Sequence, residues 1–175
     1  MSEAVGEKTA GGSGERVGQG VGGTSNGAAI SILQVLGSAT ERHQRGALED
    51  AEKGYHTVLA VEPENTDALQ LLGVLRHQQG DSNEAIRLIK KALKRAPKSP
   101  QCHQNLASVF NSLGRLDEAE KHFRKAIALD PGEAEFHANL GIVMGQKDRE
   151  EEAVACFENA LRADPKCPVA NQELG

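Results

Sequence analysis

The sequence predicts an all-α solenoid assembled from helix pairs, because several residue types recur at a single period. Prolines recur every 34 residues, at Pro63, Pro97, Pro131 and Pro165. The same interval separates four alanines and four leucines, namely Ala51, Ala85, Ala119 and Ala153, and Leu72, Leu106, Leu140 and Leu174. A fixed period of roughly 20 to 50 residues indicates stacked structural repeats, which bury a continuous core between neighbours.

Residues 1–29 precede the repeats and are predicted to form a disordered tail. They contain nine Gly and no aromatic residue, so they cannot bury enough apolar surface to offset the entropy of ordering. Gly18, Gly20 and Gly23 match the G-x-G-x-x-G pattern of dinucleotide-binding loops. That pattern requires a preceding strand and a helix directly after it, and the sequence predicts neither here. We therefore attribute the match to the Gly-rich composition.

Each repeat is predicted to contain two antiparallel helices. The predicted pairs are 30–45 with 47–60, 66–79 with 82–95, 100–113 with 116–129, and 134–147 with 150–163, followed by a ninth helix from Pro168 that is cut off at Gly175. Gly80 and Gly114 suit the left-handed position after a helix C-terminus, where the fourth repeat has Asp148. The recurring prolines end each second helix, because proline cannot donate to the helical ladder.

The aromatic side chains are assigned to the core. Tyr55, Phe123 and Phe157 recur at one apolar position, and Phe110 and Phe136 lie on core-facing helix positions. Together they account for every aromatic residue in the chain. None remains as a stacking platform for single-stranded nucleic acid.

One segment carries a family resemblance. Residues 100–132, PQCHQNLASVFNSLGRLDEAEKHFRKAIALDPG, are close to the consensus of the tetratricopeptide repeat (TPR). The resemblance implies a right-handed superhelix in which the first helix of each pair lines the concave face. It assigns residues 30–175 to one TPR domain, with the repeats 32–65, 66–99, 100–133 and 134–167 and a truncated ninth helix.

Composition excludes several classes of function. The chain has 20 Lys+Arg against 25 Asp+Glu, a net charge of −5, which argues against a general nucleic-acid binder. No apolar run approaches the roughly 20 residues that span a bilayer. Three Cys without paired spacing suggest a reducing compartment. We therefore expect a cytoplasmic protein with neither nucleic-acid nor membrane partners.

The sequence predicts no metal site, cofactor site or catalytic centre. His43 and His77, like His103 and His137, occupy equivalent positions in successive repeats. Such positions lie roughly 8 to 10 Å apart on packed helices, too far to share a zinc ion. Cys102 neighbours His103, but adjacent helical side chains point about 100° apart. All three Cys are interpreted as buried or bystander thiols.

A basic run lies on and just after one outer helix. Its members are Arg87, Lys90, Lys91, Lys94, Arg95 and Lys98. The run has two interpretations. It is either a docking patch for an acidic partner, or a solvated convex face whose cations lie favourably near a helix C-terminus. The second is the simpler interpretation.

The concave face is predicted to be uncharged and rich in amides. Its candidate peptide-binding residues are Gln70, His77, Gln104, Asn105, Ser108, Asn111 and Asn139, with Gln172 beyond them. TPR domains that bind chaperone tails use a Lys/Arg clamp, but the comparable positions here hold Gln70, Val74, Asn105, Glu135 and Asn139. The motifs HQNLA and HANLG instead resemble the repeats of O-linked N-acetylglucosamine transferases, whose Asn ladder holds the backbone of extended polypeptides.

The predicted function is a non-catalytic scaffold that binds a protein or an extended peptide. The resemblance leaves open that the repeats form the N-terminal portion of a larger bacterial glycosyltransferase or sulfotransferase. A third hypothesis is a self-assembly module whose exposed C-terminal helix pairs with another copy. Asn105 and Asn139 are the expected ligand contacts; alternatively, they bridge neighbouring repeats or hold water.

Overall fold

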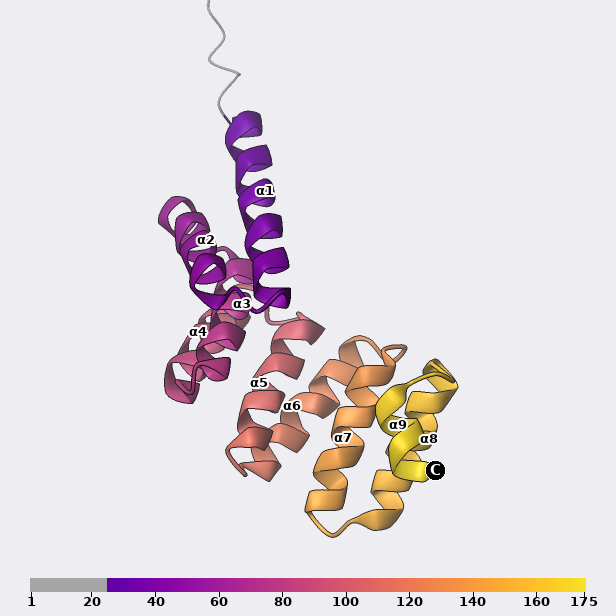
Figure 1. Cartoon of the computed structure of the whole chain (residues 1–175). Coiled ribbons are helices and arrows are strands. Elements are labelled where there is room, and N and C mark those ends of the chain that lie inside the picture. The colour runs from indigo at the N-terminus through magenta and orange to yellow at the C-terminus, as the bar shows by residue number, and fades with distance from the viewer. Residues whose placement is uncertain (1–24) are drawn as a thin grey trace, which may run out of the picture.

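The computed structural model describes residues 25–175, which form nine helices (Figure 1). Four antiparallel pairs follow one another along the chain, and a short ninth helix packs on the last of them. The pairs are α1 (Ser25–Gln44) with α2 (Leu48–Val61), α3 (Thr66–Gln78) with α4 (Ser82–Arg95), α5 (Pro100–Ser112) with α6 (Leu116–Leu129), and α7 (Ala134–Gln146) with α8 (Glu150–Ala163), followed by α9 (Pro168–Leu174). The predicted all-α solenoid is confirmed.

The predicted helix bounds from α2 onward agree with the structure to within one residue at each end. The exception is α1, which begins at Ser25 instead of residue 30. Extending a helix that is already nucleated adds one hydrogen bond per residue fixed, and Ala28 and Ala29 favour the extension. The predicted disordered tail therefore overlaps α1 at residues 25–29, and residues 1–24 lie outside the described part of the chain.

Left-handed residues end the first helix of each pair. Gly46, Gly80 and Gly114 have φ values of 78°, 91° and 69°, which glycine adopts without steric cost. Asp148 takes this place in the fourth pair with φ 57°, as the sequence predicts. The N–H of Gly80 donates to the carbonyl of His77, so the turn satisfies a carbonyl that the helix leaves free.

The helices form two layers. First helices of successive pairs contact one another, α1 with α3, α3 with α5 and α5 with α7. Second helices mainly contact the helices before and after them in the sequence. Because the first helices lie closer together than the second helices, the stack curves toward the first helices. The concave face is therefore lined by α1, α3, α5 and α7.

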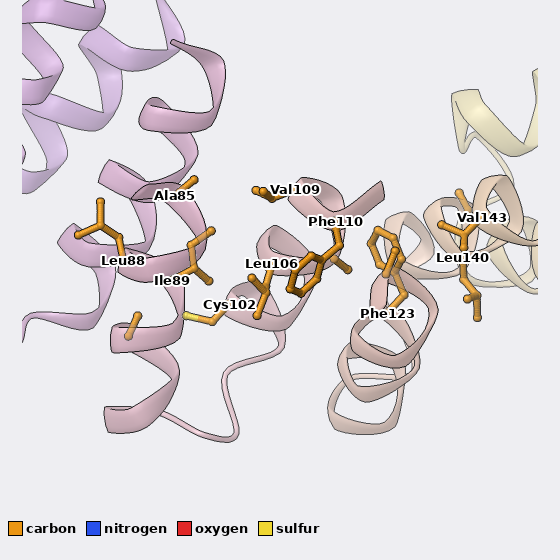
Figure 2. Packing of buried hydrophobic residues seen from close by; sticks show 14 of the residues in the cluster. Ala85, Leu88, Ile89, Cys102, Leu106, Val109, Phe110, Phe123, Leu140 and Val143 are labelled. Carbon is orange, nitrogen blue, oxygen red and sulfur yellow. The ribbon is translucent and has the colours of Figure 1, made fainter. Parts of the chain in front are cut away.

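The core runs between the pairs without interruption (Figure 2). Ile89 of α4 lies near Cys102 of α5, and Phe110 of α5 lies next to Phe123 of α6. All five aromatic side chains are buried, with Phe157 the most exposed at 5%. The core assignment of the aromatic residues is confirmed.

Glycine permits a close crossing within a pair. A Cβ atom on Gly73 would lie 2.7 Å from Cγ1 of Ile89 and 3.2 Å from the carbonyl oxygen of Ala85. At Gly141 it would lie 2.6 Å from the ring of Phe157. These positions have no room for a side chain unless the facing Ile89 or Phe157 side chain, or the helix that carries it, moves.

A charged cluster joins the third pair to the fourth. Glu120 of α6 is only 7% exposed and accepts hydrogen bonds from Lys147 at 2.5 Å and from Arg149 at 2.9 Å. Arg124 also pairs with Glu120. Burial alone would raise the pKa of Glu120, but the hydrogen bonds from Lys147 and Arg149 outweigh burial and hold this pKa below its usual range. Asp117 pairs with Lys147.

Replacing Glu120 with Ala is expected to lower the free energy of unfolding by roughly 1 to 3 kcal/mol, because it leaves partly buried cations without their carboxylate. The side chains of Lys147 and Arg149 are 20% and 33% exposed, so water limits the loss. Urea denaturation measures it. Glu118→Ala, which breaks a more exposed pair with Arg115, is the control and should cost clearly less, because water screens exposed pairs. Equal losses would contradict this role for Glu120.

Candidate functional site

The predicted peptide-binding residues all lie on the inner layer of helices. Gln70 and His77 belong to α3, and Asn139 belongs to α7. The remaining four are on α5, namely Gln104, Asn105, Ser108 and Asn111. Hydrogen bonding divides these residues into two groups. One group connects neighbouring helices, and the other keeps its polar atoms available.

Two glutamines connect successive first helices. Cys102 Sγ donates to Oε1 of Gln70 at 2.9 Å, which links α5 to α3. Gln104 Nε2 donates to Oε1 of Glu135 at 2.5 Å, which links α5 to α7. Gln104 is only 7% exposed. Burial raises the pKa of the Cys102 thiol, so this thiol stays protonated and acts as a donor.

Histidines form a second type of link, which recurs at the far end of the first helices. His43 Nε2 lies 2.9 Å from Oε1 of Gln78, and His77 Nε2 lies 3.1 Å from Oγ of Ser112. Each bond joins residues 35 apart in the sequence. The other ring nitrogen of His77, Nδ1, lies 2.9 Å from Oγ of Ser82. Both nitrogens of His77 are therefore engaged within the fold.

Four polar residues keep hydrogen-bonding capacity on the concave face. Asn105 and Asn139 are half-buried and Ser108 is exposed, and none of their side chains has a hydrogen-bond partner within residues 25–175. Asn111 is half-buried, and its Oδ1 atom is buried without a donor from the described residues. An amide offers both a donor and an acceptor, and leaving such an atom unpaired is unfavourable. These groups can accept or donate to a molecule that enters the concave face.

The concave face lacks the cations of a carboxylate clamp. The five comparable positions hold Gln70, Val74, Asn105, Glu135 and Asn139. Glu135 is exposed, and within the described residues it accepts only the hydrogen bond from Gln104. A ligand carboxylate at this place would meet amides and a like charge.

Histidines at the pair boundaries serve the fold. His103 Nε2 lies 3.3 Å from the carbonyl oxygen of Pro97, and His137 Nε2 lies 3.0 Å from that of Pro131. The two bonds occupy equivalent places in successive repeats. His103 is only 6% exposed and His137 is half-buried. His103 is therefore an interior packing residue, whereas His137 remains partly exposed.

Sequence reasoning missed His122, which pairs with His103. Their Nδ1 atoms lie 3.0 Å apart, so one ring must donate and the other accept. Burial, followed by the proximity of His103 and of nearby lysines, lowers the pKa of His122 to about 4. Burial also lowers the pKa of His103. The signal was present in the repeat register, because His122 stands where the neighbouring repeats have the apolar Leu88 and Cys156.

Residues 25–175 contain no group of three or more His, Cys, Asp or Glu side chains placed to bind a metal ion. Within the same part of the chain, no helix combines the length and the apolar composition that crossing a membrane requires.

Known family models match most of the described chain. Residues 36–100 and 71–134 match one model of the tetratricopeptide repeat, and residues 111–172 match a second model of the same repeat. The chain has no significant match among curated protein sequences.

Solved structures share the architecture. MamA is 25% identical with a TM-score of 0.66, over 77% of this chain and 78% of that one. PilF of Pseudomonas aeruginosa is 23% identical with a TM-score of 0.78, over 82% and 66%. YrrB, described as a TPR protein with an unusual peptide-binding site, is 19% identical with a TM-score of 0.67, over 83% and 75%. At these identities, PilF and YrrB show the fold alone.

Proposed function

The chain belongs to the tetratricopeptide repeat family, and from this premise we propose that it is a non-catalytic scaffold that binds an extended peptide segment on its concave face. The proposal depends mainly on one observation. The side chains of Asn105 and Asn139 are partly exposed on adjacent first helices and have no hydrogen-bond partner in the described residues.

The spacing of the two amides suits an extended chain. Asn105 and Asn139 occupy equivalent positions of successive repeats, on α5 and α7, which contact each other. Packed helices lie roughly 8 to 10 Å apart, and an extended chain advances about 3.3 to 3.6 Å per residue. Asn105 and Asn139 would therefore contact ligand residues that are about three positions apart. An amide that hydrogen-bonds to backbone N–H and C=O groups does not discriminate between ligand side chains.

Asn105 and Asn139 could alternatively bridge neighbouring repeats, but other side chains form those bridges. Gln70 and Gln104 link α3, α5 and α7 through hydrogen bonds to Cys102 and Glu135. The buried Oδ1 atom of Asn111 adds an acceptor that lacks a donor in the described residues. The peptide-binding site ascribed to YrrB supports the same kind of ligand here. We infer that a bound peptide donates to these acceptors.

Combining Asn105→Ala with Asn139→Ala should weaken peptide binding by roughly 1 to 3 kcal/mol, which is the cost of lost hydrogen bonds in the groove. The probe is an unstructured peptide selected against the wild-type protein from a random-sequence phage library, and its affinity is measured by calorimetry. The thermal midpoint should change little, because both side chains lie outside the apolar core.

Gln70→Ala is the matched control, since Gln70 lies on the same face but bonds to Cys102. It should lower the thermal midpoint and leave the affinity of the folded protein nearly unchanged. If the double Asn variant unfolds early and binds the peptide normally once folded, the two Asn are structural and the proposed groove is wrong.

Self-association is a second candidate function, and the exposure of Leu174 favours it. Leu174 on α9 is 39% exposed, whereas the equivalent Leu72, Leu106 and Leu140 are buried. Val154 of α8 is also 43% exposed. Light scattering across a dilution series tests this candidate, and Leu174→Glu should abolish any dimer. A monomer at every concentration would exclude it.

A further inference from the structure

The outer face of α4 bears a hollow lined almost entirely by bases. Its volume is about 700 Å³, and its lining residues are Glu64, Arg87, Lys90, Lys91, Lys94 and Arg95. Because α4 is a second helix, this hollow lies on the convex side, opposite the face with the free Asn side chains. All of the basic residues except Lys91 are exposed.

Three of the bases are engaged within the fold. Arg87 donates to Glu84 at 2.6 Å, and Arg95 pairs with Glu64. Lys91 Nζ donates to the carbonyl oxygen of Pro63 at 2.9 Å. The contacts of Lys91 and Arg95 tie α4 to the turn between α2 and α3, whereas the Arg87 pair lies within α4.

Lys90, Lys94 and Lys98 remain, and none of them forms an ion pair or hydrogen bond with the described residues. They are spaced four residues apart, so Lys90 and Lys94 stand on one row of the helix and repel each other. The helix dipole favours Lys94 in the last turn. It does not account for Lys90, which lies a turn earlier, with Nζ 5.7 Å from the centre of the Phe110 ring. Glu118 of α6 lies close enough to Lys90 for the charge of Lys90 to contribute to the lowered pKa of this carboxyl group, after the hydrogen bond from Arg115. The row still has no direct ion pair within the described residues, so most of its positive charge stays available to a partner.

The positive field extends from α4 to α6. Lys121 and Lys125 of α6 occupy the places that Arg87 and Lys91 occupy on α4, one repeat earlier. Within the part of the chain that the structure describes, neither lysine forms an ion pair. After burial and the neighbouring His103, the charges of Lys125, Lys121 and Lys90 all contribute to the low pKa of His122. Lysines from both helices thus act on one imidazole between them.

We propose that the convex faces of α4 and α6 form a docking surface for an acidic protein segment, with Lys90, Lys94 and Lys98 as its principal contacts. Lysine ammonium groups are mobile point charges that suit the scattered carboxylates of a flexible acidic segment. Nucleic acid fits less well, since the whole chain carries a net charge of −5 and the described aromatic side chains are all buried.

Fluorescence anisotropy tests the proposal with a labelled, unstructured peptide of about twelve residues made of Asp, Glu and Ser. The wild-type chain should bind it, more weakly as salt rises. The triple variant K90E/K94E/K98E should bind at least about tenfold more weakly. The matched control is R45E/R162E/K166E, which makes the same change in net charge away from α4 and α6 and should retain most of the affinity. K90Q/K94Q/K98Q serves if the Glu variant fails to fold, and it should also weaken binding.

Four results would overturn the proposal. They are no binding by the wild-type chain, equal losses in the triple variant and its control, tighter binding of a short DNA duplex than of the peptide, or tighter binding of vesicles rich in anionic lipid. The Asn105→Ala/Asn139→Ala variant should bind the acidic peptide normally, because its substitutions lie on the opposite face. A loss of acidic-peptide binding in that variant would also count against a separate convex surface.

Discussion

Phe123→Ala is expected to lower the free energy of unfolding by about 3 to 5 kcal/mol, the cost of deleting a fully buried aromatic side chain and leaving a cavity. Phe123 is 1% exposed and lies between α5 and α6, with α7 packed against α6 (Figure 2). The helices around it are held on both sides by further pairs, so they cannot collapse into the space. Urea denaturation followed by circular dichroism measures the loss.

Phe157→Ala at the equivalent place in the fourth repeat is the control for Phe123→Ala. Phe157 borders an open hollow that is also lined by Ile142, Val154 and Glu173, so the surrounding side chains can relax and the loss should be smaller. Stability in solenoids is close to a sum of terms for each repeat and each interface. The central substitution should therefore also broaden the unfolding transition. Equal losses at the two positions would contradict this account.

Acidification from pH 7 to pH 4 is expected to remove roughly 1 to 3 kcal/mol of stability through His122. Burial, reinforced by His103 and then the lysines, lowers the folded-state pKa of His122 from 6.5 to about 4. Below pH 6.5 the unfolded chain binds a proton at His122 that the folded chain does not bind. Stability is therefore fully present above about pH 6.5 and falls as the pH drops toward 4. The lowered pKa of His103 acts in the same direction.

His122→Leu tests the acid effect, because Leu88 stands at the equivalent position of the second repeat. The variant should lose much of the dependence of stability on pH between 4 and 6.5, as measured by urea denaturation at several pH values. A slope equal to that of the wild-type protein would assign the acid sensitivity to other groups.

Helix positions were predictable because the residues that end these helices act locally. Gly80 and Gly114 adopt the left-handed conformation that the sequence predicts, and each recurring proline follows the end of a second helix. The start of α1 was not predictable in this way, since a nucleated helix can propagate one residue at a time into a Gly-rich segment. Periodicity therefore locates the interior elements better than the first helix.

The sequence predicted where the candidate site residues lie, but not which hydrogen bonds they form. The repeat register puts Gln70, Gln104 and Asn105 on the inner layer, where the structure has them. It does not determine which side chain of the next helix lies within reach. Gln104 meets Glu135 across 31 residues, whereas Asn105 meets no partner in the described residues. Such pairing depends on distances of a few tenths of an ångström, which a sequence pattern does not fix.

Contacts that run from each helix to its near neighbours also bear on how the chain folds. The closely packed helices are α1 with α2, α3 with α4, α5 with α6 and α7 with α8, so most contacting residues are close in sequence. Low contact order favours fast folding, because only short loops must close. A growing nascent chain can complete one pair and dock it on the previous pair while the next is still being translated. The solenoid is thus suited to vectorial folding on the ribosome, with little of its apolar surface left exposed for long.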